Sequence, residues 1–173
     1  MHLITDQSYK VFKSHRKYPY WIIAILLCSF SIKFYGQEGI PSYPDSLFST
    51  YYLQRVSHFK TLPQSRRDIV FLGNSITDGA EWAELFGNPA IKNRGISGDI
   101  TAGVLHRLRD IIAGHPAKIF LLIGINDLAR NIPPDTVVHN IRLIADILHK
   151  ATPATKLYVQ SLLPVNDAFS KFP

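Results

Sequence analysis

The stretch Asp68-Ile-Val-Phe-Leu-Gly-Asn-Ser-Ile-Thr-Asp-Gly79 contains a short β-branched and aromatic run that ends at a glycine. The run at residues 69–72 is typical of a buried strand, and Gly73-Asn74 predicts a turn directly after it. The turn carries one serine, Ser75, whose hydroxyl is a potential nucleophile. We therefore expect a strand that delivers this serine to one edge of a sheet.

Two later stretches repeat this strand-and-turn pattern. Residues 90–98 end a strand in a glycine-rich turn, and residues 118–127 end one in Gly124-Ile-Asn-Asp127. A helical pattern follows each strand, so we expect three parallel strands whose carboxyl ends share one edge, where open α/β folds bind their ligands. A hydroxyl, a glycine amide and an asparagine amide would meet there, which indicates an acyl-transfer site.

Apolar residues at helical spacing predict the helices around these strands. The first helix would run from about residue 45 to residue 59, and a short one would cover residues 81–86. Two longer helices would cover residues 100–113 and 135–148, and residues 156–163 predict a fourth strand. The predicted fold class is α/β with a parallel sheet, and we expect the sheet to stop after about the fourth strand.

The length and charge of the chain restrict its possible functions. The 173 residues fit one domain with a core of its own. The formal net charge is +6, but residues 1–36 contribute +4 of it, so the remainder does not predict binding to nucleic acid. The sequence shows no phosphate-binding loop and no His, Cys and carboxylate group at metal spacing, so we expect no cofactor and no metal.

Residues 1–36 have the three parts of a secretory signal peptide. Basic residues at 10–17 precede an apolar core at 21–32, and small residues near Gly36-Gln37 suit cleavage. The core is shorter than the roughly 20 residues of a spanning helix, so we favour a cleaved signal over a retained anchor and expect no stable membrane span afterwards. The single cysteine, Cys28, lies in this core, and a mature chain without disulfides suits a bacterial periplasm or cell envelope. The predicted segments are a signal peptide (1–36), a lead-in with an amphipathic helix (37–64) and a domain (65–173).

The predicted turns hold the groups that acyl transfer needs. A serine hydroxyl becomes a nucleophile when a neighbouring base takes its proton, and the attacked carbonyl becomes an oxyanion that needs donors fixed in advance. Ser75 would supply the hydroxyl and its own N–H, Gly95 a second N–H, and the Asn126 side chain a third donor. Gly95 suits this role because a residue without Cβ lets the backbone approach a ligand closely.

These residues resemble the sequence blocks of one enzyme family. Gly73-Asn74-Ser75-Ile76-Thr77 resembles block I of the SGNH hydrolases, also called GDSL-like lipases and acylhydrolases. Asn93-Arg94-Gly95 resembles block II, and Gly124-Ile-Asn-Asp127 resembles block III. The resemblance covers about residues 68–166. It implies a flavodoxin-like three-layer α/β/α fold, with the serine, glycine and asparagine in the roles given above.

The resemblance also implies a function, a serine esterase that forms an acyl-enzyme on Ser75, and the signal-like residues 1–36 add the expectation that it is exported. Residues 73–79 followed by Trp82 look like the carbohydrate O-acetylesterase branch of the family. The expected substrate is therefore an O-acyl ester, specifically an O-acetyl ester, on a small molecule or a glycan. A lysophospholipase or thioesterase of the same family is an alternative. The sequence does not indicate an oligomeric state.

One part of the family pattern is missing. In SGNH hydrolases the catalytic His and Asp come from an Asp-x-x-His loop after a fifth strand, and we find no such loop before Pro173. We therefore expect an incomplete domain that is inactive by itself and is a fragment of a complete esterase. The alternative is a non-catalytic remnant that binds glycan or acyl ligands without turnover. Five histidines after the leader are expected on surfaces or helix flanks: His58, His106, His115, His139 and His149.

Four further residues are candidates for contact with a substrate: Asn74, Asp78, Trp82 and Arg94. Three of them also have structural interpretations. Asp78 near a helix N-terminus would interact favourably with the helix dipole, Trp82 would anchor its short helix, and Arg94 would be solvated. Asp127 is expected to brace the block III loop rather than to react.

Overall fold

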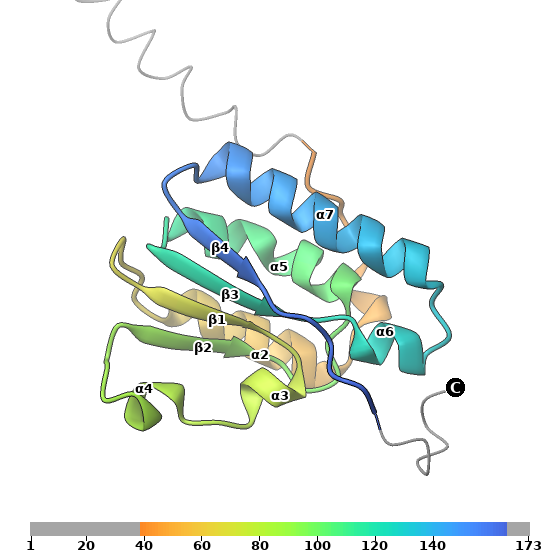
Figure 1. Ribbon diagram of the computed structural model, residues 1–173, viewed down its shortest axis with the longest axis horizontal. Coiled ribbons are helices and arrows are strands. Elements are labelled where there is room, and N and C mark those ends of the chain that lie inside the picture. Colours follow the sequence, from red (N-terminus) through yellow and green to blue (C-terminus); the bar gives the residue numbers. More distant parts are fainter. Residues whose placement is uncertain (1–38, 166–173) are drawn as a thin grey trace, which may run out of the picture. The chain divides into compact units, whose positions relative to one another are not determined.

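Residues 39–165 of the protein are described by a computed structural model, which shows a parallel β-sheet with helices around it (Figure 1). The predicted parallel α/β class is confirmed. Strand pairing puts Gly73 level with Gly95 on one side and with Leu122 on the other, so three strands end at one edge. The predicted signal peptide lies outside the described residues. The strands, in the sheet order β2-β1-β3-β4, are β1 (Ile69–Gly73), β2 (Ile91–Gly95), β3 (Lys118–Leu122) and β4 (Lys156–Val159).

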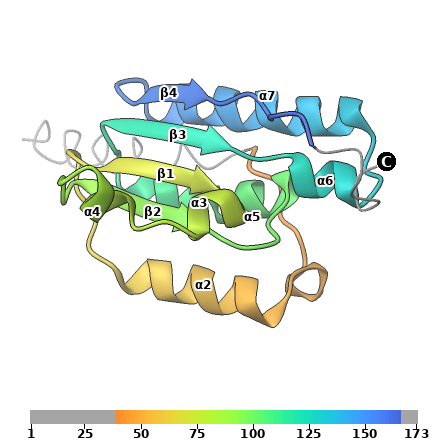
Figure 2. The same cartoon turned by 60° about the horizontal axis from the view of Figure 1, so that its bottom comes forward.

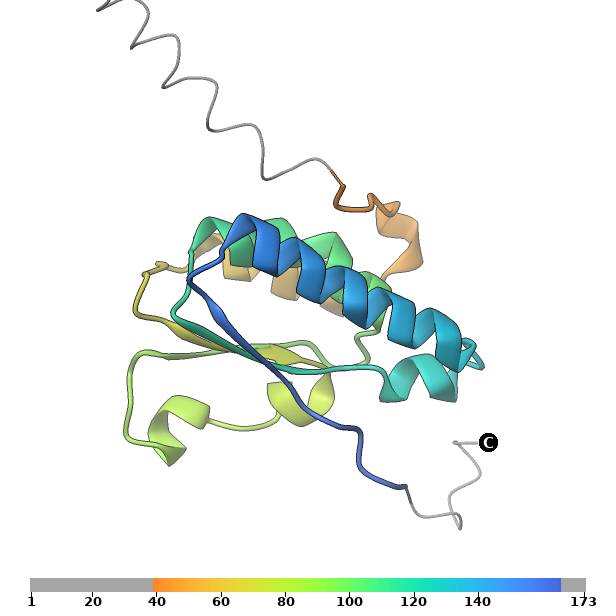
Figure 3. The same ribbon diagram turned by 45° about the horizontal axis from the view of Figure 1, so that its top comes forward.

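The two faces of the sheet carry different helices (Figures 2 and 3). The long helices α2, α5 and α7 lie on one face, whereas the short helices α3 and α4 lie on the other, and α6 follows β3 at the edge. Within the described residues the second helical layer is therefore built from short helices. No helix in this range is long and apolar enough to span a membrane. The bounds are η1 (Asp45–Leu47), α2 (Thr50–Thr61), α3 (Ser75–Asp78), α4 (Trp82–Leu85), α5 (Thr101–Ala113), α6 (Ile125–Ala129) and α7 (Pro134–Ala151).

Alternate strand residues face the long helices and form the main hydrophobic core. Leu72 of β1 and Leu121 of β3 are fully buried there, in one cluster with Leu108 of α5 and Ile144 of α7. The core thus fixes which side of each strand faces α3. A smaller cluster connects α2 to the loop after β2 and consists of Tyr52, Val56, Phe59 and Ile96.

Helix α3 packs tightly against the end of β2. A Cβ atom at Gly95 would overlap the backbone of Thr77 and Asp78, so only glycine permits this approach. The Asn93 side chain strengthens the contact, because its Nδ2 donates to the carbonyl oxygens of Asp78 and Ala80 at 3.1 and 3.0 Å. The end of β2 therefore holds α3 in place at the sheet edge.

The Asp78 carboxylate connects α3 to two other parts of the fold. Its Oδ2 accepts hydrogen bonds from Tyr51 Oη at 2.8 Å and from Ser97 N and Oγ at 3.0 and 2.7 Å, and its Oδ1 lies 3.4 Å from Arg55 Nη2. Burial alone would raise the pKa of Asp78, but the hydrogen bonds from Ser97 and Tyr51 bring it below its ordinary value of 3.8. The expected substrate contact of Asp78 is not supported, because its side chain is only 11% exposed and its oxygens are engaged.

Replacing Gly95 with alanine should destabilise the fold. The added Cβ would overlap backbone atoms rather than a flexible side chain, so α3 and β2 must separate, at a cost of about 1–3 kcal/mol in the free energy of unfolding. Urea unfolding followed by circular dichroism measures this loss. Gly114→Ala is the matched control, because Gly114 has a φ of −76° and its Cβ would meet the exposed Gln64 side chain. Equal losses in both variants would contradict the packing argument.

The contribution of Asp78 to stability should depend on pH. A carboxyl whose pKa is lower in the folded chain stabilises the fold above the unfolded pKa, and this contribution disappears as the pH falls through the folded pKa. Asp78→Asn should therefore lower the free energy of unfolding by about 1–3 kcal/mol at pH 7 and by less at pH 3. Chemical unfolding at both pH values measures the difference, with Asp146→Asn on the exposed side of α7 as the control. A loss that is the same at both pH values would rule out the ionised carboxylate as the cause.

Candidate active site

The loops that follow β1, β2 and β3 begin side by side at the carboxyl edge of the sheet (Figure 1). Ile96 N donates to Gly73 O at 3.0 Å, which connects the first loop to the second. Asn126 Nδ2 donates to Asp99 O at 2.9 Å, which connects the third loop to the second. The structure thus brings together the three segments that the sequence analysis assigned to an acyl-transfer site.

Ser75 is the first residue of α3 and is exposed at this edge. Its backbone N–H lies in the first turn, where amides have no partner within the helix. The Ser75 hydroxyl makes no hydrogen bond to another residue of the described range. Both groups are therefore free to contact a ligand.

Asn74 caps α3 instead of facing a ligand. Its Oδ1 accepts a hydrogen bond from Ile76 N at 3.0 Å, as is usual for an asparagine at a helix N-terminus. The side chain is fully buried, so the expected substrate contact of Asn74 is not supported. Its Nδ2 has no hydrogen-bond partner among the described residues.

Gly95 and Gly98 differ in the availability of their amides. Gly95 is buried, and its N–H donates to Asn93 Oδ1 at 2.8 Å, so the expected role of Gly95 as an oxyanion donor is not supported. Gly98 is exposed and has a φ of 79°, a left-handed conformation that favours glycine. Its N–H makes no hydrogen bond within the described range. Gly98 was not predicted as a donor, although it lies in the loop after β2, whereas Gly95 is the last residue of the strand itself.

The side chains of Asn126 and Asp127, at the start of α6, make different contacts. Asn126 is half-buried and uses one amide hydrogen on Asp99 O, which leaves its second amide hydrogen for a ligand. The buried Asp127 carboxylate accepts hydrogen bonds from Thr101 N and from Thr101 Oγ1, the latter at 2.6 Å. Burial raises the pKa of Asp127. Asp127 therefore caps α5 and braces its own loop against that helix.

Arg94 and Trp82 have different surroundings. Arg94 is buried beneath α2, with its guanidinium carbon 5.0 Å from the centre of the Phe59 ring, and burial lowers its pKa. Neither the expected substrate contact of Arg94 nor its solvation is supported. Trp82 donates from Nε1 to Thr77 O at 2.7 Å, which anchors α4 to α3. The Trp82 ring also lines a hollow on the same face of the sheet.

Two hollows lie on the face that carries α3 and α4. The larger one, of about 660 Å³, is lined by Trp82 and by aromatic residues of β1 and β3, among others. The smaller one, of about 330 Å³, lies between Ile76, Ile125 and residues 160–165. Ile76 lines both hollows, so a largely apolar surface extends across the sheet from the residue next to Ser75.

No histidine of the described range is hydrogen-bonded to Ser75. Asp146 and His149 have Asp-x-x-His spacing, but both are exposed on α7, on the opposite face of the sheet from α3 (Figure 3). His106 Nε2 on α5 lies 3.5 Å from Asp45 Oδ1, so this histidine contacts Asp45 and not Ser75.

The described part of the chain also contains no group of three or more His, Cys, Asp or Glu residues that could hold a metal.

Several solved structures are similar to this one. A Streptococcus pneumonia protein described as a platelet activating factor is 30% identical, with a TM-score of 0.59 over 85% of this chain and 63% of its own. A GDSL-like lipase from Bacteroides thetaiotaomicron is 30% identical, with a TM-score of 0.55 over 65% of this chain and 58% of its own. A Bacteroides fragilis protein described as an acylhydrolase is 27% identical, with a TM-score of 0.53 and the same coverage. The chain thus spans about three fifths of the length of these structures.

A comparison with functionally curated proteins gives no match. The sequence profile of the GDSL-like lipase/acylhydrolase family matches residues 71–172, which is more than half of the chain. The matched range begins in β1 and includes all three loops at the sheet edge. On the strength of this profile and of the similar structures, the chain belongs to the GDSL-like lipase/acylhydrolase family.

Proposed function

We propose that the protein is an exported serine esterase that hydrolyses O-acyl esters through an acyl-enzyme on Ser75. The observation that carries the proposal is the exposed Ser75 hydroxyl at a sheet edge that also presents a free Gly98 amide and the Asn126 side chain. Ser75 Oγ attacks the ester carbonyl and the alcohol leaves. Water then attacks the acyl-enzyme and releases the acid.

Three donors support this chemistry. The Ser75 N–H, the Gly98 N–H and the second amide hydrogen of Asn126 would stabilise the oxyanion that forms in each step. Donors held in place before the reaction need no reorganisation, and the loss of one typically costs about 2.7–4 kcal/mol of transition-state stabilisation. The links between the three loops supply this rigidity.

The proposal also requires a general base, because a serine hydroxyl is a weak nucleophile by itself. None of the histidines between residues 39 and 165 is hydrogen-bonded to Ser75, so the base would come from outside this range. Without a base, a site of this kind keeps only a small residual rate above that of water.

The proposed substrate is an O-acetyl ester carried by a carbohydrate in the periplasm or cell envelope. The likeness of residues 73–79 and Trp82 to carbohydrate O-acetylesterases supports the glycan. The signal-like pattern of residues 1–36 supports export. An aromatic ring such as Trp82 in the larger hollow offers a flat apolar surface beside the serine helix.

A second candidate is the hydrolysis of longer acyl esters, as in a lysophospholipase or thioesterase. The specific observation in its favour is the smaller hollow, of about 330 Å³, which begins at the residue next to Ser75 and is lined largely by apolar side chains. A chain of several methylene groups would bury apolar surface there.

In a preparation that hydrolyses esters, replacing Ser75 should abolish the hydrolysis. The Ser75→Ala variant has no nucleophile, so p-nitrophenyl acetate hydrolysis and covalent labelling by a fluorophosphonate should both be lost. Release of p-nitrophenol and the mass of the intact protein measure the two effects. Ser57→Ala on the exposed surface of α2 is the control and should match the wild type. Equal activity in Ser75→Ala and the wild type would exclude Ser75 as the nucleophile.

The acyl-chain preference should separate the two candidates. We expect kcat/KM for p-nitrophenyl acetate to exceed that for the octanoate ester. If the smaller hollow holds the acyl chain, each buried methylene contributes about 1 kcal/mol or more, and octanoate would be preferred by well over tenfold. The ratio of the two kcat/KM values, measured on one preparation, decides between the candidates. A preference for octanoate would contradict the acetyl proposal.

A further inference from the structure

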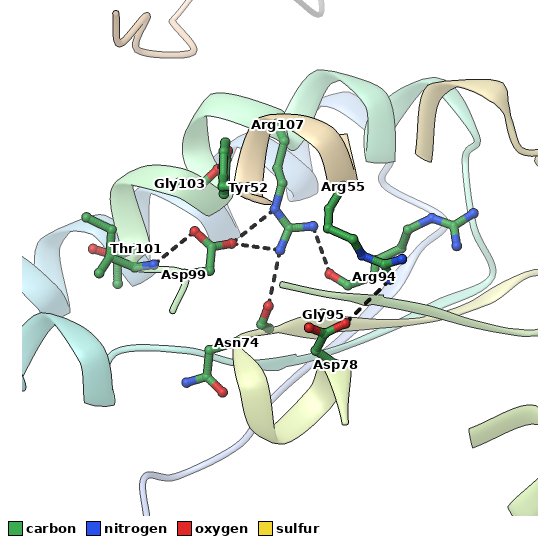
Figure 4. A network of polar contacts seen from close by, with 12 residues as sticks. Tyr52, Arg55, Asn74, Asp78, Arg94, Gly95, Asp99, Thr101, Gly103 and Arg107 are labelled. Carbon is green, nitrogen blue, oxygen red and sulfur yellow. Dashed lines mark hydrogen bonds and ion pairs between the residues drawn. The ribbon is translucent and has the colours of Figure 1, made fainter. Parts of the chain in front are cut away.

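A buried arginine of α5, Arg107, reaches the ends of two strands at once (Figure 4). Its Nη1 donates to Arg94 O at 2.8 Å, and its Nη2 donates to Gly73 O at 3.2 Å. Its Nε and Nη2 also donate to Asp99 Oδ2 at 3.1 and 2.9 Å. The side chains of Arg107 and Asp99 are only 2% and 1% exposed, so this pair is shielded from water.

Each of these acceptors belongs to a backbone segment that leads into the candidate site. Gly73 O lies in the peptide unit before Asn74, two residues ahead of Ser75. Asp99 follows Gly98 directly, and its own carbonyl oxygen accepts the hydrogen bond from Asn126. One guanidinium therefore contacts the first two loops directly and reaches the third through Asp99.

Stability alone does not explain this arrangement. Removing two charges from water costs several kcal/mol per ion, and well-packed apolar residues of similar volume often stabilise a core equally well. The donors of a guanidinium form a rigid planar fork. A guanidinium can therefore hold several acceptor atoms in fixed positions, which an apolar side chain cannot do. Burial raises the pKa of Asp99, while the adjacent Arg107 guanidinium acts in the opposite direction.

We propose that Arg107 is a positioning residue, which fixes the Ser75 loop through Gly73 O, the Gly98 loop through Asp99, and the Asn126 side chain through the Asp99 carbonyl. The catalytic part of this proposal rests on the proposed function. The ordering of the three loops by the Arg107 side chain can be measured in a protein that shows no enzymatic activity.

The test compares amide hydrogen exchange in the wild type and in Arg107→Lys, which keeps the charge but loses the planar fork. One protected amide reports on each loop: Thr77, Asp99 and Leu128, which donate to Asn74, Ile96 and Gly124. We expect exchange at all three to accelerate roughly tenfold or more. The amide of Thr155, before β4, should change little and serves as the distant reference.

Tyr52→Phe is the matched control variant. It removes one buried hydrogen bond to α5, from Tyr52 Oη to Gly103 O at 2.6 Å, and keeps the aromatic ring that packs in one cluster with Ile96. It should leave the three reporter amides as in the wild type. If Arg107→Lys does not fold, amide exchange is compared between the wild type and Asp99→Asn, which removes the carboxylate that pairs with Arg107. The proposal is overturned if the three reporters stay unchanged in a folded variant, or if Thr155 accelerates equally.

A kinetic measurement then separates this proposal from the proposed function. In a preparation with Ser75-dependent hydrolysis, Arg107→Lys should lower kcat for p-nitrophenyl acetate about 10²-fold with little change in KM, because misplaced groups lose transition-state contacts. Added guanidinium ion should restore part of the rate in Arg107→Ala. An unchanged kcat would overturn the positioning role. Hydrolysis that does not depend on Ser75 would overturn the proposed function instead, and the exchange data would still decide the ordering of the loops.

Discussion

The position of Ser75 depends on the hydrogen-bonded register of three parallel strands. Because Gly73 pairs with both Gly95 and Leu122, β1, β2 and β3 end at the same height and their loops begin side by side. A slip of one residue would also turn Leu72 out of the core, since successive side chains point to opposite faces. Burial of one sheet face and alignment of the loops are therefore set by the same contacts.

The sequence predicted well the strands, turns and helices that depend on residues close together in the chain. The apolar run at 69–72 and the turn after it became β1 and α3, and the pattern at 100–113 became α5. Helix α7 shows the limit of local signals. Its helical spacing of apolar residues predicts that Val138 is buried, but Val138 is 46% exposed, whereas Val137 is 4% exposed. A shift of one position rotates a helix face by about 100°. The contact between α5 and α7 decides that rotation, and the spacing within α7 does not.

Features that depend on distant residues were not predictable in the same way. The resemblance assigned an oxyanion role to Gly95, but the lack of a Cβ there serves the approach of α3. Arg94 and Arg107 are both arginines near the same strand end, and nothing in their spacing shows that both are buried with different partners. The apolar run of β3 is typical of a strand that is covered on both faces. Within the described residues the Phe120 side instead lines the larger hollow.

Three charges of this site lie behind the groups that would meet a substrate. Arg107, Asp99 and Asp127 are buried and hydrogen-bonded to backbone atoms, to Thr101 or to each other, whereas the Ser75 hydroxyl and the Gly98 amide are exposed. The exposed Arg130 guanidinium also lies at this edge and donates to Gly98 O at 2.7 Å. Charge–dipole attraction is stronger where water is excluded, so buried charges can hold neutral dipoles in fixed directions. Neutral donors fixed in this way stabilise an oxyanion as it forms, without attracting a competing anion from solution. The buried ionic layer therefore contributes to chemistry through orientation, and its charges need not touch the reacting atoms.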